Sequence, residues 1–195
     1  MRGPGYLFWV FHAFVTMSIC LARDPIRITG RWLFFSVIAG ELEGASGDPH
    51  ICICHADLRA ANFIDDGFRL WLIDWEYGGF GNAWFDVGNM AAISGFERSA
   101  EARLLASYLE GEPTEADWRR FDALRCAANL REALWAMVSE QHLALESTTR
   151  LTRQSSFRLR KSLRYPYRTL RFRLNSAGRV RCRMPPIMRV KSTVR

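Results

Sequence analysis

Hydrophobic residues between positions 51 and 74 of this 195-residue chain form short runs that are typical of strands. Ile51 to Cys54 is a compact apolar run, and Arg69 to Ile73 alternates weakly between polar and apolar residues. Asp65 to Gly67 lies just before the second run and is a turn signal. The pattern therefore predicts short strands, with a tight turn leading into the last of them.

After position 83 the apolar residues recur at the three- and four-residue spacing of helices. Trp84 to Ser94 predicts a buried helix, and a second helix is expected from about Ser99 to Leu109. Thr114 with Asp117 resembles a capping box and predicts the start of a long amphipathic helix that runs to about Leu145. Its expected core-facing positions are Trp118, Phe121, Leu124, Ala128, Leu134, Trp135 and Val138.

Two apolar stretches, Tyr6 to Ala22 and Trp32 to Ala39, precede the predicted strands. Each is interpreted as a buried helix or strand, or as sequence without an evolved structure. The first stretch has two further interpretations, a signal peptide or a membrane anchor. It has no clear small-x-small cleavage site, and it is short for a spanning helix, which needs about 20 apolar residues.

A basic C-terminal tail accounts for the net charge of +7. Arg150 to Arg195 holds 15 of the 27 basic residues and none of the 20 acidic ones, so residues 1–149 carry a net charge of −8. This acidic body suits a site for Mg²⁺ or for a cationic substrate. The tail is either disordered or an anion-binding segment for nucleic acid or acidic lipid. We expect disorder, and we do not expect a nucleic-acid partner.

The cysteines are odd in number and irregularly spaced, which favours reduced thiols in a cytoplasmic protein over a disulfide framework. Cys52 and Cys54 lie beside His55, but two thiols on one face of a strand explain them better than a metal site does. The five cysteines are Cys20, Cys52, Cys54, Cys126 and Cys182.

Three polar residues between positions 55 and 74 form a set that suits phosphoryl transfer. Asp57 is followed by Asn62 five residues later, and Asp74 follows a predicted strand. A carboxylate in the first position can orient a hydroxyl group and accept its proton. The other two side chains offer hard oxygen ligands to Mg²⁺ on the phosphates of ATP.

Three motifs follow one another in this region. The chain reads H-A-D-L-R-A-A-N from His55 to Asn62, I-D-W-E-Y from Ile73 to Tyr77, and F-D-V-G-N from Phe85 to Asn89. This order resembles the choline/ethanolamine kinase branch of the aminoglycoside-phosphotransferase-like kinases. The resemblance implies an α+β fold, namely the C-terminal lobe of a protein-kinase-like fold, mostly helical with short strands around the catalytic loop. It also implies ATP and Mg²⁺ as cofactors.

The resemblance gives the polar residues of these motifs specific roles. It implies that Asp57 is the catalytic base and that Asn62 and Asp74 hold the metal. His55 is expected to pack under the catalytic loop, and Asp86 is expected to support the loop through backbone hydrogen bonds.

Substrate contacts are less sharply indicated. Arg59 is either a γ-phosphate ligand or a solvated side chain. Trp135 falls where choline-kinase-like proteins carry a choline-facing Trp, although core packing explains it equally well. Glu76, Tyr77 and Trp84 are further candidates. Where some choline kinases carry a second Trp, this chain has Glu132.

The N-terminal lobe of such a kinase is not visible in the sequence. Only 56 residues precede Asp57, they contain no G-x-G-x-x-G, and the chain's lysines are Lys161 and Lys191. We expect an apolar segment without resemblance at 1–37, a kinase-like segment at 38–147 and an Arg-rich tail at 148–195. Shifted reading frames at both ends, or a short paralogue with new termini, would explain this organisation.

The predicted function is ATP-dependent phosphoryl transfer to the hydroxyl of a small alcohol of the choline or ethanolamine type, impaired where truncation removes the nucleotide lobe. One alternative is another small-molecule kinase of the same family. Another is a non-catalytic kinase lobe with an anion-binding tail. Membrane association through residues 6–22 is a minor alternative to a cytoplasmic location. The oligomeric state stays open.

Overall fold

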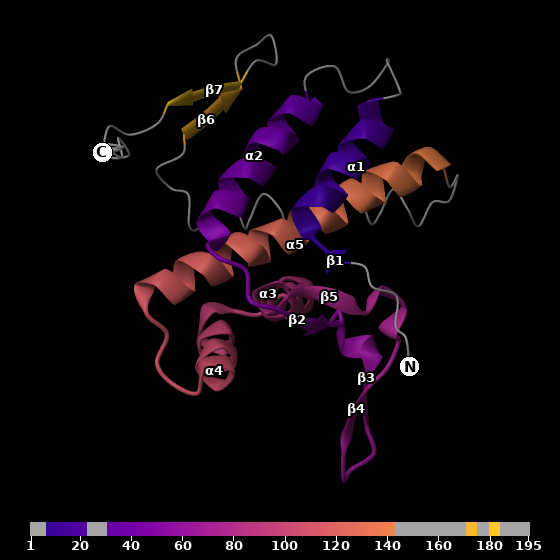
Figure 1. Cartoon of the computed structure of the whole chain (residues 1–195), viewed down its shortest axis with the longest axis vertical. Coiled ribbons are helices and arrows are strands. Elements are labelled where there is room, and N and C mark those ends of the chain that lie inside the picture. The colour runs from indigo at the N-terminus through magenta and orange to yellow at the C-terminus, as the bar shows by residue number, and fades with distance from the viewer. Residues whose placement is uncertain (1–6, 23–30, 143–170, 175–179, 184–195) are drawn as a thin grey trace.

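The computed structural model describes residues 7–22, 31–142, 171–174 and 180–183 (Figure 1). A long helix lies between two other helices on one side and a small sheet with further helices on the other. The elements in chain order are β1 (Leu7–Phe8), α1 (Val10–Ala22), α2 (Arg31–Ser46), β2 (Ile51–Cys54), η1 (Ala60–Asn62), β3 (Phe63–Asp65), β4 (Leu70–Leu72), η2 (Trp75–Tyr77), β5 (Gly79–Asn82), α3 (Ala83–Ser94), α4 (Arg98–Leu109), α5 (Glu115–His142), β6 (Arg171–Leu174) and β7 (Val180–Arg183).

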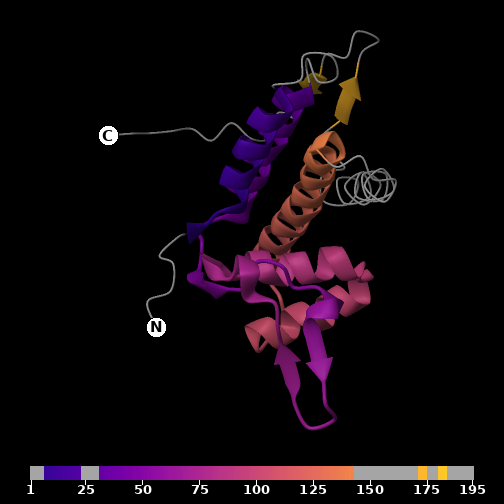
Figure 2. The ribbon, with the colours of Figure 1, turned by 90° about the vertical axis from the view of Figure 1, so that its right-hand side faces the viewer.

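Helix α5 forms the centre of the core. Its middle section is buried on nearly every face, because α3 packs against one side and α1 and α2 pack against another (Figure 2). The fully buried residues of this section include Phe121, Leu124, Leu130 and Leu134. The long helix expected from its apolar spacing is therefore confirmed, and it is more deeply buried than an amphipathic surface helix.

The apolar stretches near the N-terminus fold as helices of the core. Phe11 and Phe14 of α1 and Ile38 and Leu42 of α2 are buried against α5 and each other. This agrees with the interpretation of these stretches as buried elements. Among the described residues, no helix has the length and apolar character needed to cross a membrane.

The strands that carry the site form two small sheets. β5 lies between β1 and β2, parallel to the first and antiparallel to the second, and β3 pairs with β4 as a hairpin. The predicted run Ile51–Cys54 is β2, and the predicted turn joins β3 to β4. The Asn82 side chain then accepts a hydrogen bond from the Trp84 backbone N–H and caps α3.

The remaining helices begin close to their predicted positions. Helix α4 begins at Arg98, one residue before the expected Ser99. The capping box at the start of α5 is present: Asp117 Oδ2 accepts from the Thr114 N–H at 2.9 Å, and the Asp117 N–H donates to Thr114 Oγ1 at 3.3 Å. The last described residue of α5 is His142, so the expected end near Leu145 lies outside the described residues.

The basic tail is described only at two strands of four residues each, β6 and β7, which pair antiparallel. Here the structure differs from the expectation of a tail without regular structure. Arginines alternate with Phe172 and Leu174 in one strand and with Val180 and Cys182 in the other, and alternation of this kind favours strands. The rest of residues 148–195 lies outside the described residues.

Candidate functional site

His55 fixes the start of the loop that follows β2. Its ring is buried, Nδ1 accepts a hydrogen bond from the Asp57 backbone N–H at 3.3 Å, and Nε2 lies 2.8 Å from the Ile73 carbonyl oxygen. Because Nδ1 is an acceptor, the proton lies on Nε2, which donates to Ile73. The Trp75 ring packs edge-on against the imidazole, with centroids 4.9 Å apart. His55 therefore joins the loop to the segment that carries Asp74.

Asp86, in the first turn of α3, binds the backbone of the loop. Its Oδ2 accepts from the His55 N–H at 2.7 Å and its Oδ1 from the Ala56 N–H at 2.8 Å. Ala56 has a φ of 63°, a left-handed conformation that a non-glycine residue adopts only when its surroundings enforce it. Burial raises the pKa of Asp86 above its ordinary value, even though these two N–H donors lower it.

Arg131 of α5 also binds the same loop. Its Nη1 donates to the Ala56 carbonyl oxygen at 2.6 Å, and its Nη2 donates to Asp57 Oδ1 at 2.9 Å. The side chain is buried and carries a charge into a helix whose neighbours Leu130, Ala133 and Leu134 are fully buried. Sequence reasoning missed this residue. The available signal was an arginine inside a buried apolar stripe, where a charge requires a partner.

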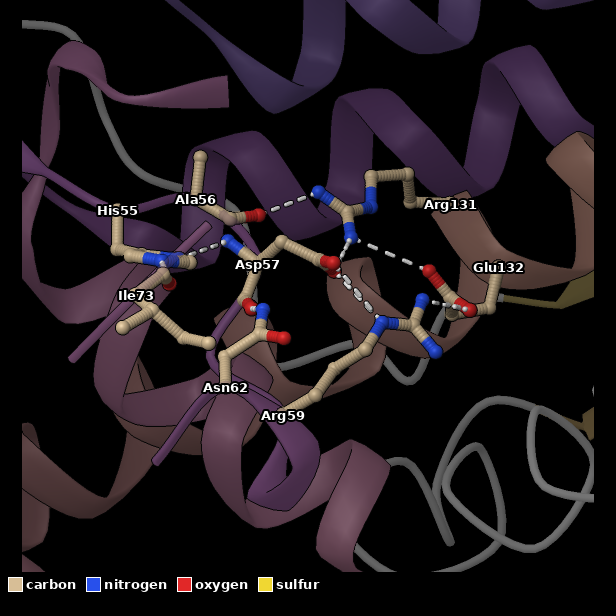
Figure 3. Close-up of polar contacts among 8 residues, drawn as sticks. All are labelled: His55, Ala56, Asp57, Arg59, Asn62, Ile73, Arg131 and Glu132. Atoms are coloured by element: carbon tan, nitrogen blue, oxygen red, sulfur yellow. Dashed lines mark hydrogen bonds and ion pairs between the residues drawn. The ribbon is translucent and has the colours of Figure 1, made fainter. Parts of the chain in front are cut away.

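Arg59 lies across the Asp57 carboxylate (Figure 3). Its Nε is 3.0 Å and 2.9 Å from the two carboxylate oxygens, and its Nη2 donates to Glu132 Oε2 at 2.9 Å. Glu132 Oε1 also accepts from Arg131 Nη2 at 3.2 Å. The Arg59 guanidinium is thus paired with two carboxylates, while its side chain stays partly exposed. Its interpretation as a γ-phosphate ligand stays a prediction.

These pairs change the ionisation of Arg59. Burial lowers the pKa of the guanidinium, but the charges and hydrogen bonds of Glu132 and Asp57 raise it by more, so it lies above the ordinary value. Asp57, Arg59, Arg131 and Glu132 form the ion-pair network of this site, and the two positive charges balance the two negative ones.

Asn62 and Asp74 provide oxygen atoms near this network. The Asn62 Nδ2 donates to the Asp57 carbonyl oxygen at 3.1 Å. The Oδ1 of Asn62 has no hydrogen-bond partner among the described residues. Asp74 has a left-handed backbone with a φ of 63° and an exposed side chain that makes no cap hydrogen bond. An amide oxygen and a free carboxylate are donors that fit Mg²⁺, which takes few protein ligands.

A cavity of about 450 Å³ brings most of these residues together. Phe8, Ala13 and Met17, from β1 and α1, form one wall. The sequence-predicted residues that line the cavity are Asp57, Arg59, Asn62, Asp74, Tyr77 and Trp135, and Glu132 and Arg131 join them. Catalytic, metal-ligating and substrate candidates therefore share one space.

Two aromatic candidates are placed differently from each other. Trp135 is 46% exposed and lines the cavity, so its assignment to the core-facing positions of the long helix is wrong. Trp84 is buried in the core, where its ring packs edge-on against Tyr108. Glu76 is exposed and lies outside the cavity lining, unlike its neighbour Tyr77.

The thiols of β2 lie close together but do not form a metal centre. Cys52 Sγ is 3.8 Å from Cys54 Sγ, as expected for two residues on one face of a strand. Burial raises the pKa of the Cys54 thiol far above its ordinary value, which disfavours the thiolate that metals bind. Within the described part of the chain, no three His, Cys, Asp or Glu side chains gather in a metal-binding group.

Two curated proteins are similar to this chain in sequence. Protein LicA of Haemophilus influenzae is 28% identical over 113 residues, which cover 55% of this chain and 33% of that protein. Ethanolamine kinase 2 of Mus musculus is 28% identical over 115 residues, covering 49% of this chain and 30% of the relative. The chain thus spans about a third of the length of these curated relatives.

Solved structures share the fold. A choline/ethanolamine kinase family protein from Mesorhizobium loti superposes with a TM-score of 0.73 at 21% identity, over 84% of this chain and 56% of that one. A structure of LicA in complex with AMP superposes with a TM-score of 0.60 at 18% identity, over 83% and 56% of the two chains.

The model of the phosphotransferase enzyme family matches residues 24–124. The match begins upstream of the boundary expected after residue 37, so the resemblance extends further toward the N-terminus than the three motifs indicate. It ends before residue 147, and the boundary expected there stays a prediction. Because the match covers more than half of the 195 residues, the chain belongs to the phosphotransferase enzyme family, and it has the fold of the choline/ethanolamine kinases.

Proposed function

We propose that this chain supplies the catalytic base and the metal ligands for ATP-dependent phosphoryl transfer. The acceptor is the hydroxyl group of a small amino alcohol of the choline or ethanolamine type. The observation that carries the proposal is the shared cavity, which is lined by Asp57, Asn62 and Asp74 together with Trp135. The three polar residues supply a base and metal ligands, and the aromatic ring supplies a face for a cation.

Asp57 acts on the acceptor hydroxyl. The carboxylate is held by Arg59 and Arg131, so its position is fixed before substrate arrives. It accepts a hydrogen bond from the hydroxyl and aims the oxygen at the γ-phosphorus. It takes the proton as the new P–O bond forms and the bond from the γ-phosphorus to the bridging oxygen breaks, which releases ADP. Most of the rate enhancement then comes from positioning, since phosphoryl transfer demands little covalent chemistry from the protein.

Asn62 and Asp74 are the residues that would hold Mg²⁺. Held there, Mg²⁺ would neutralise charge on the phosphates of ATP. Asn62 also stiffens the loop through its hydrogen bond to the Asp57 carbonyl, so a single side chain serves the metal and the base. The fit rests on one oxygen from each residue, since both residues line the same cavity.

The walls of the cavity support the proposed substrate class. Trp135 and Tyr77 are half-exposed aromatic residues that line it, and an ammonium group binds favourably against such rings. One relative is named ethanolamine kinase 2, and a LicA protein from Streptococcus pneumoniae, whose structure shares the fold, is described as a choline kinase. ATP as the donor is supported by the family's fold and by the AMP complex of a LicA protein. Use of ATP as the donor favours a cytoplasmic location, because cells keep ATP in the cytoplasm.

Release of ADP with a panel of alcohols tests the proposal. The panel contains ethanolamine, choline, other amino alcohols and an aminoglycoside, with Mg²⁺-ATP in each reaction. Wild type should turn over at least one amino alcohol, and Asp57→Ala should lose about a hundredfold or more of that rate. Asp48→Ala removes an exposed carboxylate outside the cavity lining and is the matched control. Turnover that is absent, or unchanged in Asp57→Ala, overturns the proposal.

A further inference from the structure

One member of the ion-pair network is more exposed than the other three. The Arg59 side chain is 40% exposed, whereas those of Asp57, Glu132 and Arg131 are 14%, 18% and 10% exposed. Arg131 is also tied to the Ala56 carbonyl. The side-chain contacts of Arg59 with Asp57 and Glu132 are all made by its terminal guanidinium, on a flexible side chain. Rotation of that side chain would release Arg59 and leave the other three residues in place.

The charge of the site changes when Arg59 leaves. With Arg59 in place, two guanidiniums balance two carboxylates. Without it, Asp57 and Glu132 share only Arg131, and the partly buried group has a net charge of −1. A single monovalent cation would restore the balance. The cavity therefore becomes selective for a cation at the moment Arg59 moves away.

Glu132 is placed to receive such a cation beside an aromatic ring. It lies three residues before Trp135 on α5, a spacing that puts both side chains on one helix face, and both line the cavity with Asp57. An amino alcohol with its ammonium group at Glu132 and Trp135 would place its hydroxyl toward Asp57. The same side chains hold the substrate and orient it for transfer.

We propose that Glu132 is a specificity-determining residue that binds the protonated amine of the substrate, and that Arg59 covers it until an anion draws Arg59 away. This inference rests on the proposed function for the identity of the substrate. A phosphate group is the anion that the reaction itself brings to the cavity, and Arg binds phosphate through paired N–H donors. Binding of phosphate and binding of amine thus favour each other.

The proposal also sets the preferred amine. A primary ammonium donates up to three hydrogen bonds, and one of them can go to Glu132. A quaternary ammonium has no N–H to donate and gains only the charge and the aromatic face. Loss of one hydrogen bond to a charged group corresponds to about tenfold in affinity or more, so ethanolamine should bind more tightly than choline.

Calorimetry on the full chain tests the proposal by binding alone, with no phosphoryl transfer required. Ethanolamine and choline are titrated in the presence and absence of inorganic pyrophosphate. For wild type we expect ethanolamine to bind at least about tenfold more tightly with pyrophosphate present, and to be preferred over choline. Glu132→Gln should lose about tenfold or more in ethanolamine affinity and clearly less in choline affinity, because choline loses only the charge and not a hydrogen bond. Glu112→Gln, an exposed carboxylate in the loop before α5, is the matched control.

Arg59→Gln gives the opposite shift, which a merely structural role would not produce. It should bind ethanolamine without pyrophosphate about as tightly as wild type does with it. If Glu132→Gln keeps the ethanolamine preference, or Arg59→Gln still needs pyrophosphate, the inference is wrong. The kinase proposal is judged separately, by ADP release: Glu132-dependent amine binding without turnover would support the inference and reject the proposed reaction.

Discussion

The guanidinium of Arg131 and the backbone carbonyl of Ala56 form a hydrogen bond of 2.6 Å between groups 75 residues apart in the chain. Ala56 is fully buried and holds a left-handed backbone conformation, with a φ of 63°. Asp86 binds the N–H of the same residue from α3. The strained residue before Asp57 is thus clamped on both of its peptide groups, by side chains from two helices that pack against each other.

Replacement of Arg131 by Met should be strongly destabilising. Met has a side chain of similar length, but the change leaves the Ala56 carbonyl buried without its donor and removes a buried cation that pairs with Asp57 and Glu132. Loss of one partner from a buried network costs about 3–5 kcal/mol, which urea unfolding would measure. Arg131→Lys keeps the charge but not the forked geometry, so an intermediate loss is expected.

The control for Arg131→Met is Arg119→Met on the same helix. Arg119 is 66% exposed and pairs with Glu115 one turn earlier. An exposed pair at this spacing contributes only about 0.3–0.5 kcal/mol. Equal losses for the two variants would show that the Arg131 contacts contribute nothing beyond a surface ion pair.

Residues close together in the sequence account for what could be predicted. The turn before β4, the cap at Thr114 and the strand at Ile51–Cys54 each depend on side chains a few residues apart, so local spacing reports them directly. The set of Asp57, Asn62 and Asp74 was visible for a related reason, because a motif records a loop geometry in fixed spacing. The structure brings these three residues to one cavity.

The rest depends on contacts that no local pattern carries. Arg59 and Glu132 are 73 residues apart, and their ion pair exists only because α5 crosses the catalytic loop. Trp135 fits the apolar spacing of α5, yet it faces the cavity, because the space that a core residue would fill is lined there by charged groups. Helical spacing defines a face but not what lies opposite that face.

Asp86 gives a pH dependence whose sign follows from its environment. Its pKa is raised in the folded protein, mainly by burial, so the folded state binds its proton more tightly than the unfolded state does. The stability that the folded protein gains from this tighter proton binding is therefore complete below about pH 4, the ordinary aspartate pKa. It is lost as pH rises through the pKa of Asp86 in the folded protein. The stability of wild type relative to Asp86→Asn should decrease over this window.

Urea unfolding of both proteins at a series of pH values from about 4 to 7 would measure this difference. Asp86→Asn should also be less stable throughout, because an amide cannot accept from both the His55 and Ala56 N–H groups. Asp48→Asn, an exposed position, should give a flat difference. A wild-type advantage that grows with pH would contradict the assigned direction.

Gly88 marks the closest approach of α3 to α5. A Cβ atom at this position would lie 2.8 Å from the Arg125 backbone nitrogen and 3.0 Å from the Leu124 carbonyl carbon. Backbone atoms in a packed helix cannot move aside cheaply, so Gly88→Ala should cost about 1–3 kcal/mol, despite the better helix propensity of Ala. Gly40→Ala in α2 meets nothing within 4 Å and should stabilise by up to about 1 kcal/mol. Thermal unfolding separates the two, and a stabilised Gly88→Ala would show that the helices can move apart.

The capping box of α5 should lose its effect in acid. The Thr114 hydroxyl and N–H both donate to Asp117 and lower the pKa of its carboxyl. Because the pKa is lowered, the ionised Asp117 stabilises the folded state at every pH above the ordinary aspartate pKa of about 4. This stabilisation is lost as pH falls through the lower pKa of Asp117 in the folded protein. Thr114→Ala should cost about 1 kcal/mol at neutral pH. Asp117→Asn should be destabilising there, with a penalty that shrinks in acid. Urea unfolding at both pH values would measure it, and a constant penalty would mean that the carboxylate charge plays no part in the cap.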